Sequence, residues 1–392
     1  MPIYPIKNEK GKVTGYIVKI NYTDNKGEYQ QPTRSARTRE EARDIENELY
    51  YKFKTKKESA DITFVELYRK YMESCRYELR ETTIEKKERI FKEYVLPCFS
   101  KQKINKITPT HVEEWKVELN RTISERTGNH LSLKTKRNIY SELKSILSYA
   151  SKFYGLKNNP TAIAGQIKDS NITKSKMDFY TYKEFEQFIT VALKHALDEE
   201  ENKGTIQGWH YYIYFNIAFY MGFRKGEIHA LNWKDYKDNK LSINKSLTQK
   251  LKGRSNVITP PKTHSSYRDV LIPKALLSIL KEHYDRCAKI GEFNKSSFIC
   301  GIDVPLRDTT IDKRKKNYAE EAGIKNIRMH DFRHSHASVL INAGVNIIEI
   351  ARRLGHSNIK ETLDTYGHLY PEQEDFAVVA LDKLTVKSSK FV

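Results

Sequence analysis

Cysteine is scarce in this sequence. The chain has 392 residues and only four cysteines, no two of which form a Cys-x-x-Cys pair: Cys75, Cys98, Cys287 and Cys300. Disulfide frameworks need dense cysteines, and cysteine-based zinc sites need closely spaced ones. The sequence therefore argues against both kinds of site and fits a reducing cytosol.

Long apolar runs are missing as well. No uninterrupted apolar stretch is long enough to span a bilayer, and the opening residues MPIYPIKNEKGKV have no apolar signal core. There is also no tandem repeat and no low-complexity tract. We therefore expect a soluble, cytoplasmic protein without a membrane partner.

Acidic residues are too few to balance the basic ones. Lys and Arg number 69 against 50 Asp and Glu, which gives a formal charge of +19. Such a surplus suggests a polyanionic partner, most often DNA or RNA. A generally basic surface that aids solubility is the alternative. The content of 39% hydrophobic and 30% charged residues fits folded domains, and the length predicts two or three of them.

Residues 1–57 predict a small sheet followed by a helix. Apolar residues alternate with polar ones before a turn at residues 24–27, as in a half-buried strand: Tyr16, Val18, Ile20 and Tyr22. Thr38 and Glu41 form a capping box that predicts the start of a helix. Basic residues are scattered over both strands, so this unit could lay its sheet on a DNA groove. A small packing module is the alternative.

Residues 59–166 predict an all-helical domain. Helix starts are indicated by Thr63 with Glu66, Thr82 with Glu85, Thr108 with Pro109, and Ser132. One face of the last helix carries Ile139, Leu143, Ile146 and Ala150. Three basic residues near the start of that helix could meet DNA phosphates, although a solvated face would have the same composition: Lys134, Lys136 and Arg137.

Residues 174–392 predict a third, larger domain that is mostly helical. A polar stretch over residues 165–176 is typical of an interdomain linker. Thr181 with Glu184 caps the first helix, and one strand-turn-strand region runs from Lys240 to Ile272. The predicted fold class is therefore multidomain and mainly α with small β elements.

Four stretches of the third domain stand out by residue type. GFRKGE covers residues 222–227, PKT covers 261–263, HDFRHSHA covers 330–337, and LGH at 354–356 precedes TYGH at 365–368. In this order and spacing they resemble the catalytic signature of the tyrosine recombinases, the lambda-integrase-type integrases of phages and conjugative transposons. The helical segment resembles that family's core-binding domain. The N-terminal unit is similar, more loosely, to its arm-type DNA-binding domains.

The resemblance implies that Tyr366 is the nucleophile and that Arg224 and Arg333 clamp the scissile phosphate. Tyrosine suits this task because it keeps the phosphate as an ester. Its free phenol has a pKa of about 10, so it needs a proton acceptor or electrostatic help. Two arginine forks would stabilise the added negative charge of the transition state without a metal. No metal or other cofactor is expected, and the sequence shows no P-loop.

The resemblance implies four further roles. His330 would be the acid or base near the nucleophile, and His356 would donate a second hydrogen bond to the phosphate. Lys262 would protonate the departing 5′ oxygen, and Glu227 would orient the pocket by fixing a neighbouring His or Arg. The remaining motif histidines are expected to pack or to support the site from behind: His334, His336 and His368.

Other interpretations of these residues stay open. His330 and His334 are four residues apart and could bind zinc, although no third ligand is evident. Residues 337–365 scan as a helix-turn-helix with Gly344 in the turn, so a non-enzymatic DNA-binding regulator would look similar. Such a regulator has no use for Tyr366 among these arginines. A type IB topoisomerase would share the chemistry and relax DNA without partner sites.

The resemblance also implies partners and a site of action. We expect double-stranded DNA attachment sites, a homotetramer on two of them, and catalysis through a 3′-phosphotyrosine intermediate that integrates and excises a mobile element. An accessory DNA-bending or excisionase protein is a further candidate partner. The protein would then work at the nucleoid in the cytoplasm.

Overall fold

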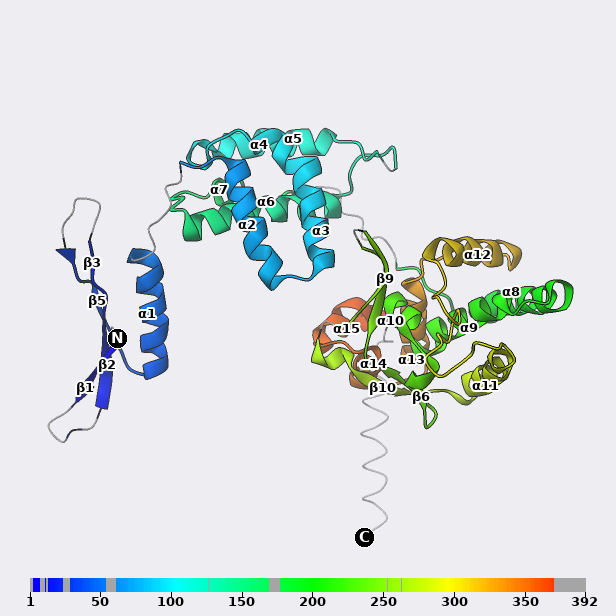
Figure 1. Cartoon of the computed structure of the whole chain (residues 1–392). Coiled ribbons are helices and arrows are strands. Elements are labelled where there is room, and N and C mark those ends of the chain that lie inside the picture. The colour runs from blue at the N-terminus through cyan, green and yellow to red at the C-terminus, as the bar shows by residue number, and fades with distance from the viewer. Residues whose placement is uncertain are drawn as a thin grey trace, which may run out of the picture. The chain divides into compact units, whose positions relative to one another are not determined.

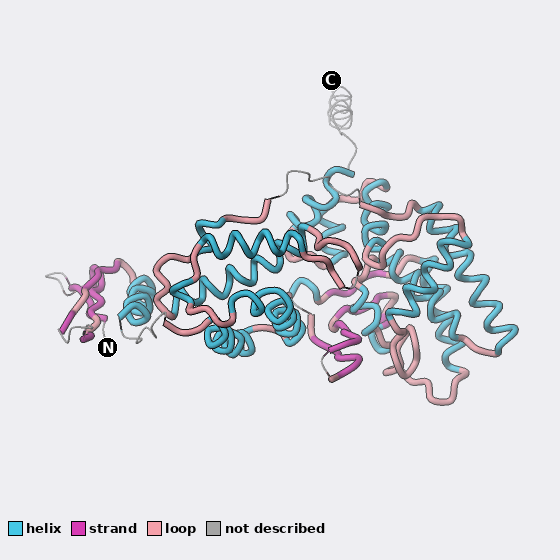
Figure 2. Tube along the Cα trace, turned by 90° about the horizontal axis from the view of Figure 1, so that it is seen from above, coloured by secondary structure: helices cyan, strands magenta, loops and turns pink. Residues whose placement is uncertain are grey.

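The computed structural model describes residues 3–7, 11, 13–23, 29–53, 61–125, 127–168, 177–251, 253–261 and 263–369. The chain divides into two compact units, Met1–Ile172 and Thr173–Val392. Helices predominate, and the strands of the described residues form two three-stranded and two two-stranded sheets (Figure 1; Figure 2). The predicted fold class, mainly α with small β elements, is confirmed. Among these residues, no helix has both the length and the apolar character needed to cross a membrane.

The N-terminal part of the first unit is a sheet with a helix packed against it (Figure 1). Its antiparallel sheet has the order β1-β2-β5, and β3 pairs with β4. The core between sheet and helix holds Val18, Ile20, Ala36, Ala42 and Leu49. The elements are β1 Ile3–Lys7, β2 Val13–Lys19, β3 Tyr22–Thr23, β4 Tyr29–Gln30, β5 Thr33–Ala36 and α1 Arg39–Phe53.

The start of α1 is close to the predicted capping box. The Thr38 hydroxyl accepts a hydrogen bond from the backbone N–H of Glu41 at 3.1 Å. The Glu41 carboxylate, however, accepts from the N–H of Arg37 at 2.8 Å rather than from that of Thr38. The helix therefore begins where the sequence predicts. The Glu41 carboxylate, however, binds the backbone N–H one residue before the one that it binds in a capping box. The predicted turn at residues 24–27 lies outside the described residues.

The rest of the first unit is helical, with its own apolar core of residues that include Phe64, Phe91, Phe99 and Trp115. The capping box of Thr63, the Thr108–Pro109 start and the Ser132 cap are confirmed. The elements are α2 Phe64–Glu78, α3 Glu81–Ile90, a π-helical turn Phe91–Val95, α4 Leu96–Phe99, a 3₁₀ turn Ile104–Lys106, α5 Pro109–Arg121, α6 Leu133–Phe153 and α7 Pro160–Ala164.

The predicted capping box of Thr82 with Glu85 is wrong. Arg80 takes the cap position of α3 with an extended backbone (φ −66°, ψ 146°) and without a side-chain cap. Its carbonyl already accepts from the N–H groups of Thr83 and Ile84 at 2.8 and 3.1 Å. The helix thus starts before Thr82, because the backbone makes its first helical bonds without help from the threonine side chain.

The fourth predicted helix is α6. Its predicted apolar face is confirmed, since Ile139, Leu143, Ile146 and Ala150 are buried. The three basic residues lie in its first two turns, where Lys134 and Arg137 are exposed and Lys136 is half-buried. Arg137 Nε also donates to the Ile167 carbonyl at 3.0 Å.

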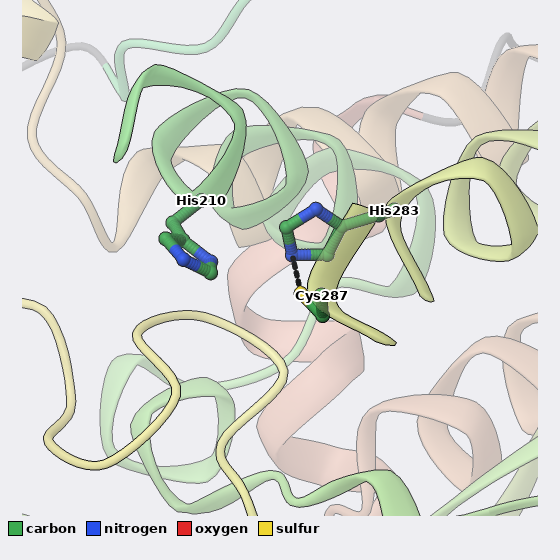
Figure 3. A group of neighbouring side chains, drawn as sticks. All are labelled: His210, His283 and Cys287. Carbon is green, nitrogen blue, oxygen red and sulfur yellow. Dashed lines mark hydrogen bonds between the residues drawn. The ribbon is translucent and has the colours of Figure 1, made fainter. Parts of the chain in front are cut away.

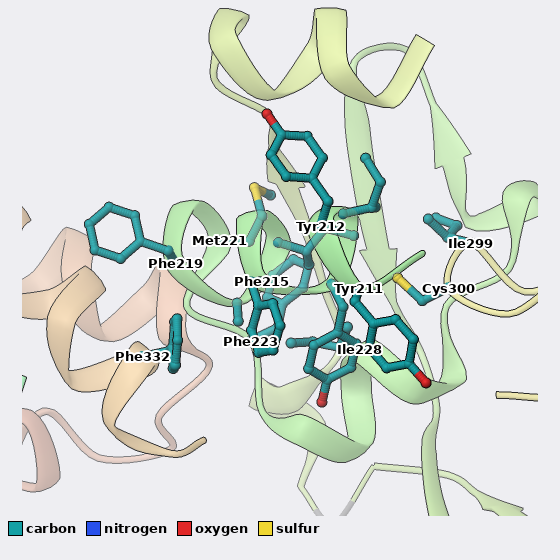
Figure 4. Close-up of a cluster of buried hydrophobic side chains, with 14 of the residues drawn as sticks. Tyr211, Tyr212, Phe215, Phe219, Met221, Phe223, Ile228, Ile299, Cys300 and Phe332 are labelled. Carbon is teal, nitrogen blue, oxygen red and sulfur yellow. The ribbon is translucent and has the colours of Figure 1, made fainter. Parts of the chain in front are cut away.

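The second unit is built around α9, a helix buried on all sides. Residues 208–219 and Met221 are all buried, as expected of a helix that is apolar all round. Figure 4 shows its aromatic side chains packed with Phe223 and Phe332. The helices are α8 Tyr182–Lys203, α9 Gln207–Met221, α10 Lys225–Ala230, α11 Lys274–Ala288, α12 Asp308–Glu321, α13 Asp331–Asn342, α14 Ile347–Leu354 and α15 Ile359–Tyr366. The predicted capping box at the start of α8 is confirmed.

The predicted strand-turn-strand region holds four strands. β10, β7 and β6 form an antiparallel sheet in that order. β8 and β9 form a separate hairpin, in which Ser246 pairs with Thr259. The bounds are β6 Tyr236–Lys237, β7 Lys240–Ile243, β8 Ser246–Leu251, β9 Arg254–Thr259 and β10 Arg268–Leu271, with 3₁₀ turns at Trp233–Asp235, His264–Ser266 and Gly367–Leu369. Lys262, between β9 and β10, lies outside the described residues.

The predicted helix-turn-helix consists of α13 and α14. Gly344 lies in the turn with φ 75°, a conformation that favours glycine. Ile350, Ala351 and Leu354 are buried on the inner face of α14, as predicted. Ile350 and Leu354 share a core with Tyr366, so this helix pair packs against the candidate nucleophile.

Candidate active site

Arg333 connects three of the four sequence motifs. It lies in the first turn of α13, and its side chain is buried with 2% of the residue exposed. Nη1 donates to the Gly222 carbonyl at 2.9 Å, and Nη2 donates to the Leu354 carbonyl at 2.8 Å. Burial and the nearby positive charge of Arg224 lower the pKa of Arg333 to about 9. At neutral pH the guanidinium therefore remains charged.

His356 lies directly against Arg333. Arg333 Nη2 is 2.8 Å from His356 Nε2, and His356 Nδ1 is 2.7 Å from the Thr362 hydroxyl. Arginine can only donate, so Nε2 is the acceptor and Nδ1 carries the proton. Burial and the charges of Arg333 and Arg224 lower the pKa of His356 to about 3. The ring is therefore neutral in this arrangement.

Glu227 holds two arginines at the start of α10. Arg224 Nη1 donates to one carboxylate oxygen at 3.1 Å, and the backbone N–H of Arg224 donates to the other at 2.9 Å. Arg268, on β10, donates to both oxygens at 3.2 and 2.8 Å. Although Glu227 is buried, these contacts hold its pKa below the usual value. Its carboxylate therefore fixes two guanidinium groups.

Arg268 is a site residue that the sequence analysis missed. Its Nε donates to the Arg353 carbonyl at 2.9 Å, and a side chain at Gly355 would come within 2.9 Å of its Nη1. Gly355 has φ 70° and ends α14 just before His356. Arg268 thus joins the sheet to the turn that carries His356. No sequence motif marks it, because it stands alone at the start of a strand.

Tyr366 is the last residue of α15 and is buried, with 1% of the residue exposed. Its hydroxyl lies 2.7 Å from Nδ1 of His334. Burial raises the pKa of Tyr366 to about 12, while the charge of Arg333 opposes the shift. His330 precedes α13 and is exposed, and its ring meets the ring of His334 edge-on with centroids 4.8 Å apart. The histidine that contacts the candidate nucleophile is therefore His334, which the sequence analysis had assigned to packing or support.

His336 supports the site from behind, as expected. Its Nδ1 donates to the Phe219 carbonyl at 2.8 Å, and its Nε2 accepts from Arg353 Nε at 3.2 Å. Arg353 in turn donates to the Tyr220 carbonyl at 3.2 Å. This chain of contacts fastens α14 to the end of α9. The side chain of His368, the third histidine of this group, lies outside the described part of the structure.

A second group of buried titratable residues, His210, His283 and Cys287, belongs to the aromatic core (Figure 3). His210 Nδ1 accepts from the Gly301 N–H at 3.2 Å, and His283 Nε2 is 2.9 Å from the Ile299 carbonyl. Burial lowers the pKa of His210 to about 4 and that of His283 to about 3. These neutral rings bind backbone groups and fasten the 299–301 loop to α9 and α11.

The structure thus gathers Arg224, Glu227, His330, Arg333, His356 and Tyr366 around one cation-rich site of the second unit. Cationic forks beside a buried tyrosine can bind a phosphodiester and stabilise charge on its non-bridging oxygens. Lys262 lies outside the described residues. Lys134, Lys136 and Arg137 belong to the first unit and are not part of this site.

Two family models match this chain. Residues 190–373 match the phage integrase family, and residues 63–120 match the N-terminal SAM-like domain of phage integrases. The chain belongs to the phage integrase family. It is a tyrosine recombinase, an enzyme that cleaves and rejoins DNA in the site-specific recombination of mobile elements.

Individual relatives support the same family. The chain is 31% identical over 361 residues to the ICEBs1 integrase of Bacillus subtilis strain 168, covering 89% of this chain and 91% of the relative. A structure of the Tn1549 transposon integrase in complex with transposon right end DNA has a TM-score of 0.64 at 20% identity, covering 83% of this chain and 100% of that one. A lambda integrase dimer bound to a core site has a TM-score of 0.53 at 13% identity, covering 95% of each chain. At these identities the two structures show a common fold.

We expect Arg268→Met to destabilise the second unit by about 3 kcal/mol, because it leaves the buried Glu227 carboxylate with one partner fewer. The double variant Arg268→Met with Glu227→Gln should recover part of this loss. Arg352→Met is a matched control, since it breaks an exposed ion pair with Glu349 and should cost less than about 1 kcal/mol. Urea unfolding measures all three, and equal losses for Arg268→Met and Arg352→Met would contradict the assignment.

Proposed function

We propose that Tyr366 attacks the scissile phosphate and forms a 3′-phosphotyrosine bond, which an incoming 5′ hydroxyl later resolves. The observation that carries this proposal is the 2.7 Å contact between the Tyr366 hydroxyl and Nδ1 of His334. The charges of Arg333 and Arg224 also lower the pKa of Tyr366 against the effect of burial. Both steps are transesterifications, so the phosphodiester energy is kept in the enzyme–DNA bond.

Arg224 and Arg333 are proposed to bind the two non-bridging oxygens of that phosphate. Arg224 is the more accessible of the two, and Glu227 sets the direction of its guanidinium. Arg333 Nη2 now contacts His356. A bound phosphate would replace His356 as the acceptor of this Arg333 hydrogen bond. The His356 ring would then be free to reorient and donate its own N–H to the same phosphate oxygen. The fixed charges would then stabilise the transition state without a metal or another cofactor.

Two further groups are proposed to move protons. His330 is exposed beside His334 and could exchange protons between the site and solvent as its acid or base. Lys262 follows β9 in the sequence, and we propose that it protonates the 5′ oxygen as it leaves. The support for Lys262 is its place in the sequence after Pro261, shortly before β10, whose Arg268 binds Glu227 of the site.

We further propose how the chain binds and arranges its DNA. Residues 1–57 would act as an arm-type DNA-binding domain, 59–166 as the core-binding domain and 174–392 as the catalytic domain. Lys134, Lys136 and Arg137 would contact phosphates at the start of α6, where the positive end of the helix dipole favours the same anion.

Recombination between two sites needs four strand cuts, so we propose a homotetramer on two double-stranded attachment sites. An accessory DNA-bending or excisionase protein would set the direction of the reaction. Because the substrate is DNA, the proposed place of action is the nucleoid in the cytoplasm.

Tyr366→Phe should abolish covalent attachment to a nicked attachment-site DNA while leaving affinity for that DNA within about twofold, because only the nucleophilic oxygen is lost. Tyr284→Phe, a tyrosine in the aromatic core of the same unit, is the matched control and should form the adduct. Denaturing gels detect the adduct. An adduct formed by Tyr366→Phe would show that another residue is the nucleophile.

For Lys262→Ala, we expect cleavage to fall by about 10² and to recover on DNA whose scissile 5′ bridging oxygen is replaced by sulfur, because a thiolate leaves without a proton. Lys250→Ala on the neighbouring strand is the control and should need no rescue. Arg224→Ala should stay inactive on the sulfur substrate, since its missing charge acts on the non-bridging oxygens. If sulfur fails to restore Lys262→Ala, the general acid is another residue.

A further inference from the structure

The mechanism proposed above gives His330 a role as acid or base but does not say which group takes the proton directly from the Tyr366 phenol. That hydroxyl is buried, and a buried tyrosine O–H almost always needs an acceptor. Among the described residues its one hydrogen-bond partner is Nδ1 of His334, at 2.7 Å. The distance is that of a well-formed hydrogen bond. Donation from the phenol to this ring nitrogen satisfies the buried O–H, and it places the ring's own proton on Nε2.

The placement of His334 is set by the same helix that places the phosphate clamp. His334 follows Arg333 in the first turns of α13, and α13 is fixed by the two carbonyls that Arg333 binds. Tyr366 arrives from α15 and packs with Ala337, Ile341 and Leu354 in one core. The tyrosine–histidine contact therefore joins two elements whose positions the site already determines.

We propose that His334 is the proton acceptor for the Tyr366 nucleophile during strand cleavage and the donor of that proton during religation. The inference rests on the proposed role of Tyr366 and adds a catalytic residue to it.

The Oη–H proton passes to Nδ1 of His334 as Oη forms its bond to phosphorus, which makes an imidazolium with a proton on each nitrogen. The bond between phosphorus and the 5′ oxygen breaks, and that oxygen takes its proton from the general acid proposed above. In religation the incoming 5′ hydroxyl attacks phosphorus, and the tyrosine oxygen leaves and recovers the proton from Nδ1 of His334.

The electrostatic surroundings keep His334 ready to accept. Burial first, and then the charge of His330, lower the pKa of His334 to about 4, so the ring is neutral at pH 7. A bound phosphate adds a negative charge, which would raise this pKa and favour the imidazolium as the reaction proceeds. The titratable and charged groups that act on His334 or Tyr366 are Arg328, His330, Asp331 and Arg333 around the start of α13, Glu361 on α15, and Arg224 on the segment before α10.

His330 is the alternative acceptor, and the geometry disfavours it. Its ring is exposed and contacts the ring of His334, and in the described part of the chain the phenol makes no hydrogen bond to it. His330 is therefore placed to exchange a proton with His334 or with solvent rather than with Tyr366 directly.

The test compares His334→Asn with His330→Asn in the full-length protein. The asparagine carbonyl oxygen replaces Nδ1 as a hydrogen-bond acceptor, so the tyrosine stays in place, but an amide does not take up a proton at these pH values. Single-turnover formation of the covalent adduct on a nicked attachment-site DNA is measured between pH 6.5 and 8.5. DNA affinity and thermal melting are measured for both variants in parallel.

For His334→Asn we expect a cleavage rate reduced by about 10² at pH 7, the lower end of the range typical of a general base. Its rate should rise about tenfold per pH unit, because a phenol with a pKa of about 12 must then ionise to solvent. The wild type should show a nearly flat profile, since His334 is already neutral over this range. His330→Asn is expected to cleave more slowly and to keep the flat profile.

Three outcomes would overturn the proposal: a flat profile for His334→Asn, a rate within about threefold of the wild type, or a steep profile for His330→Asn instead. If His334→Asn does not bind DNA, His334→Ala is tested with added imidazole, which should restore cleavage in proportion to its neutral form. A lack of rescue then counts against the proposal. Absence of any Tyr366 adduct in the wild type would instead refute the proposed function.

Discussion

The site depends on one buried cation, the guanidinium of Arg333. Its hydrogen bonds to the Gly222 and Leu354 carbonyls and to His356 draw together the ends of α9 and α14 around the first turn of α13. An isolated buried charge is costly, and neutral carbonyls offset only part of that cost. The proposed binding of a phosphate would supply the negative charge that this buried guanidinium lacks.

The neighbouring groups are arranged around that charge. Glu227 is a buried anion whose charge offsets the positive charges of Arg224 and Arg268 close to Arg333. Each of its two carboxylate oxygens accepts one hydrogen bond from Arg224 and one from Arg268. The same positive field and burial keep His356 and His334 neutral. One electrostatic arrangement thus leaves a neutral His356 against Arg333 and a neutral His334 beside the Tyr366 hydroxyl.

Much of the fold and of the candidate site could be predicted from the sequence, because the residues that the chemistry requires stand in separate, recognisable motifs. Arg224, Arg333, His356 and Tyr366 stand in such motifs, and the helix caps at Thr63, Thr108, Ser132 and Thr181 follow from local backbone needs. The cap at Thr82 failed because Arg80 begins the helix through backbone bonds alone. Arg268 was missed because its partner is distant in sequence. The contact of His334 with Tyr366 was missed because the sequence does not show which of the nearby histidines faces α15, the helix that carries Tyr366.

The most direct test of this account asks whether Arg333 acts through its charge on the phosphate. Arg333→Ala should fail to cleave ordinary attachment-site DNA, and it should regain cleavage when a methyl group replaces one non-bridging oxygen of the scissile phosphate. That substitution removes the negative charge that the guanidinium would neutralise, so the arginine is no longer needed. A folded, DNA-binding Arg333→Ala protein that cleaves neither substrate, or that cleaves the ordinary one at the wild-type rate, would contradict the account.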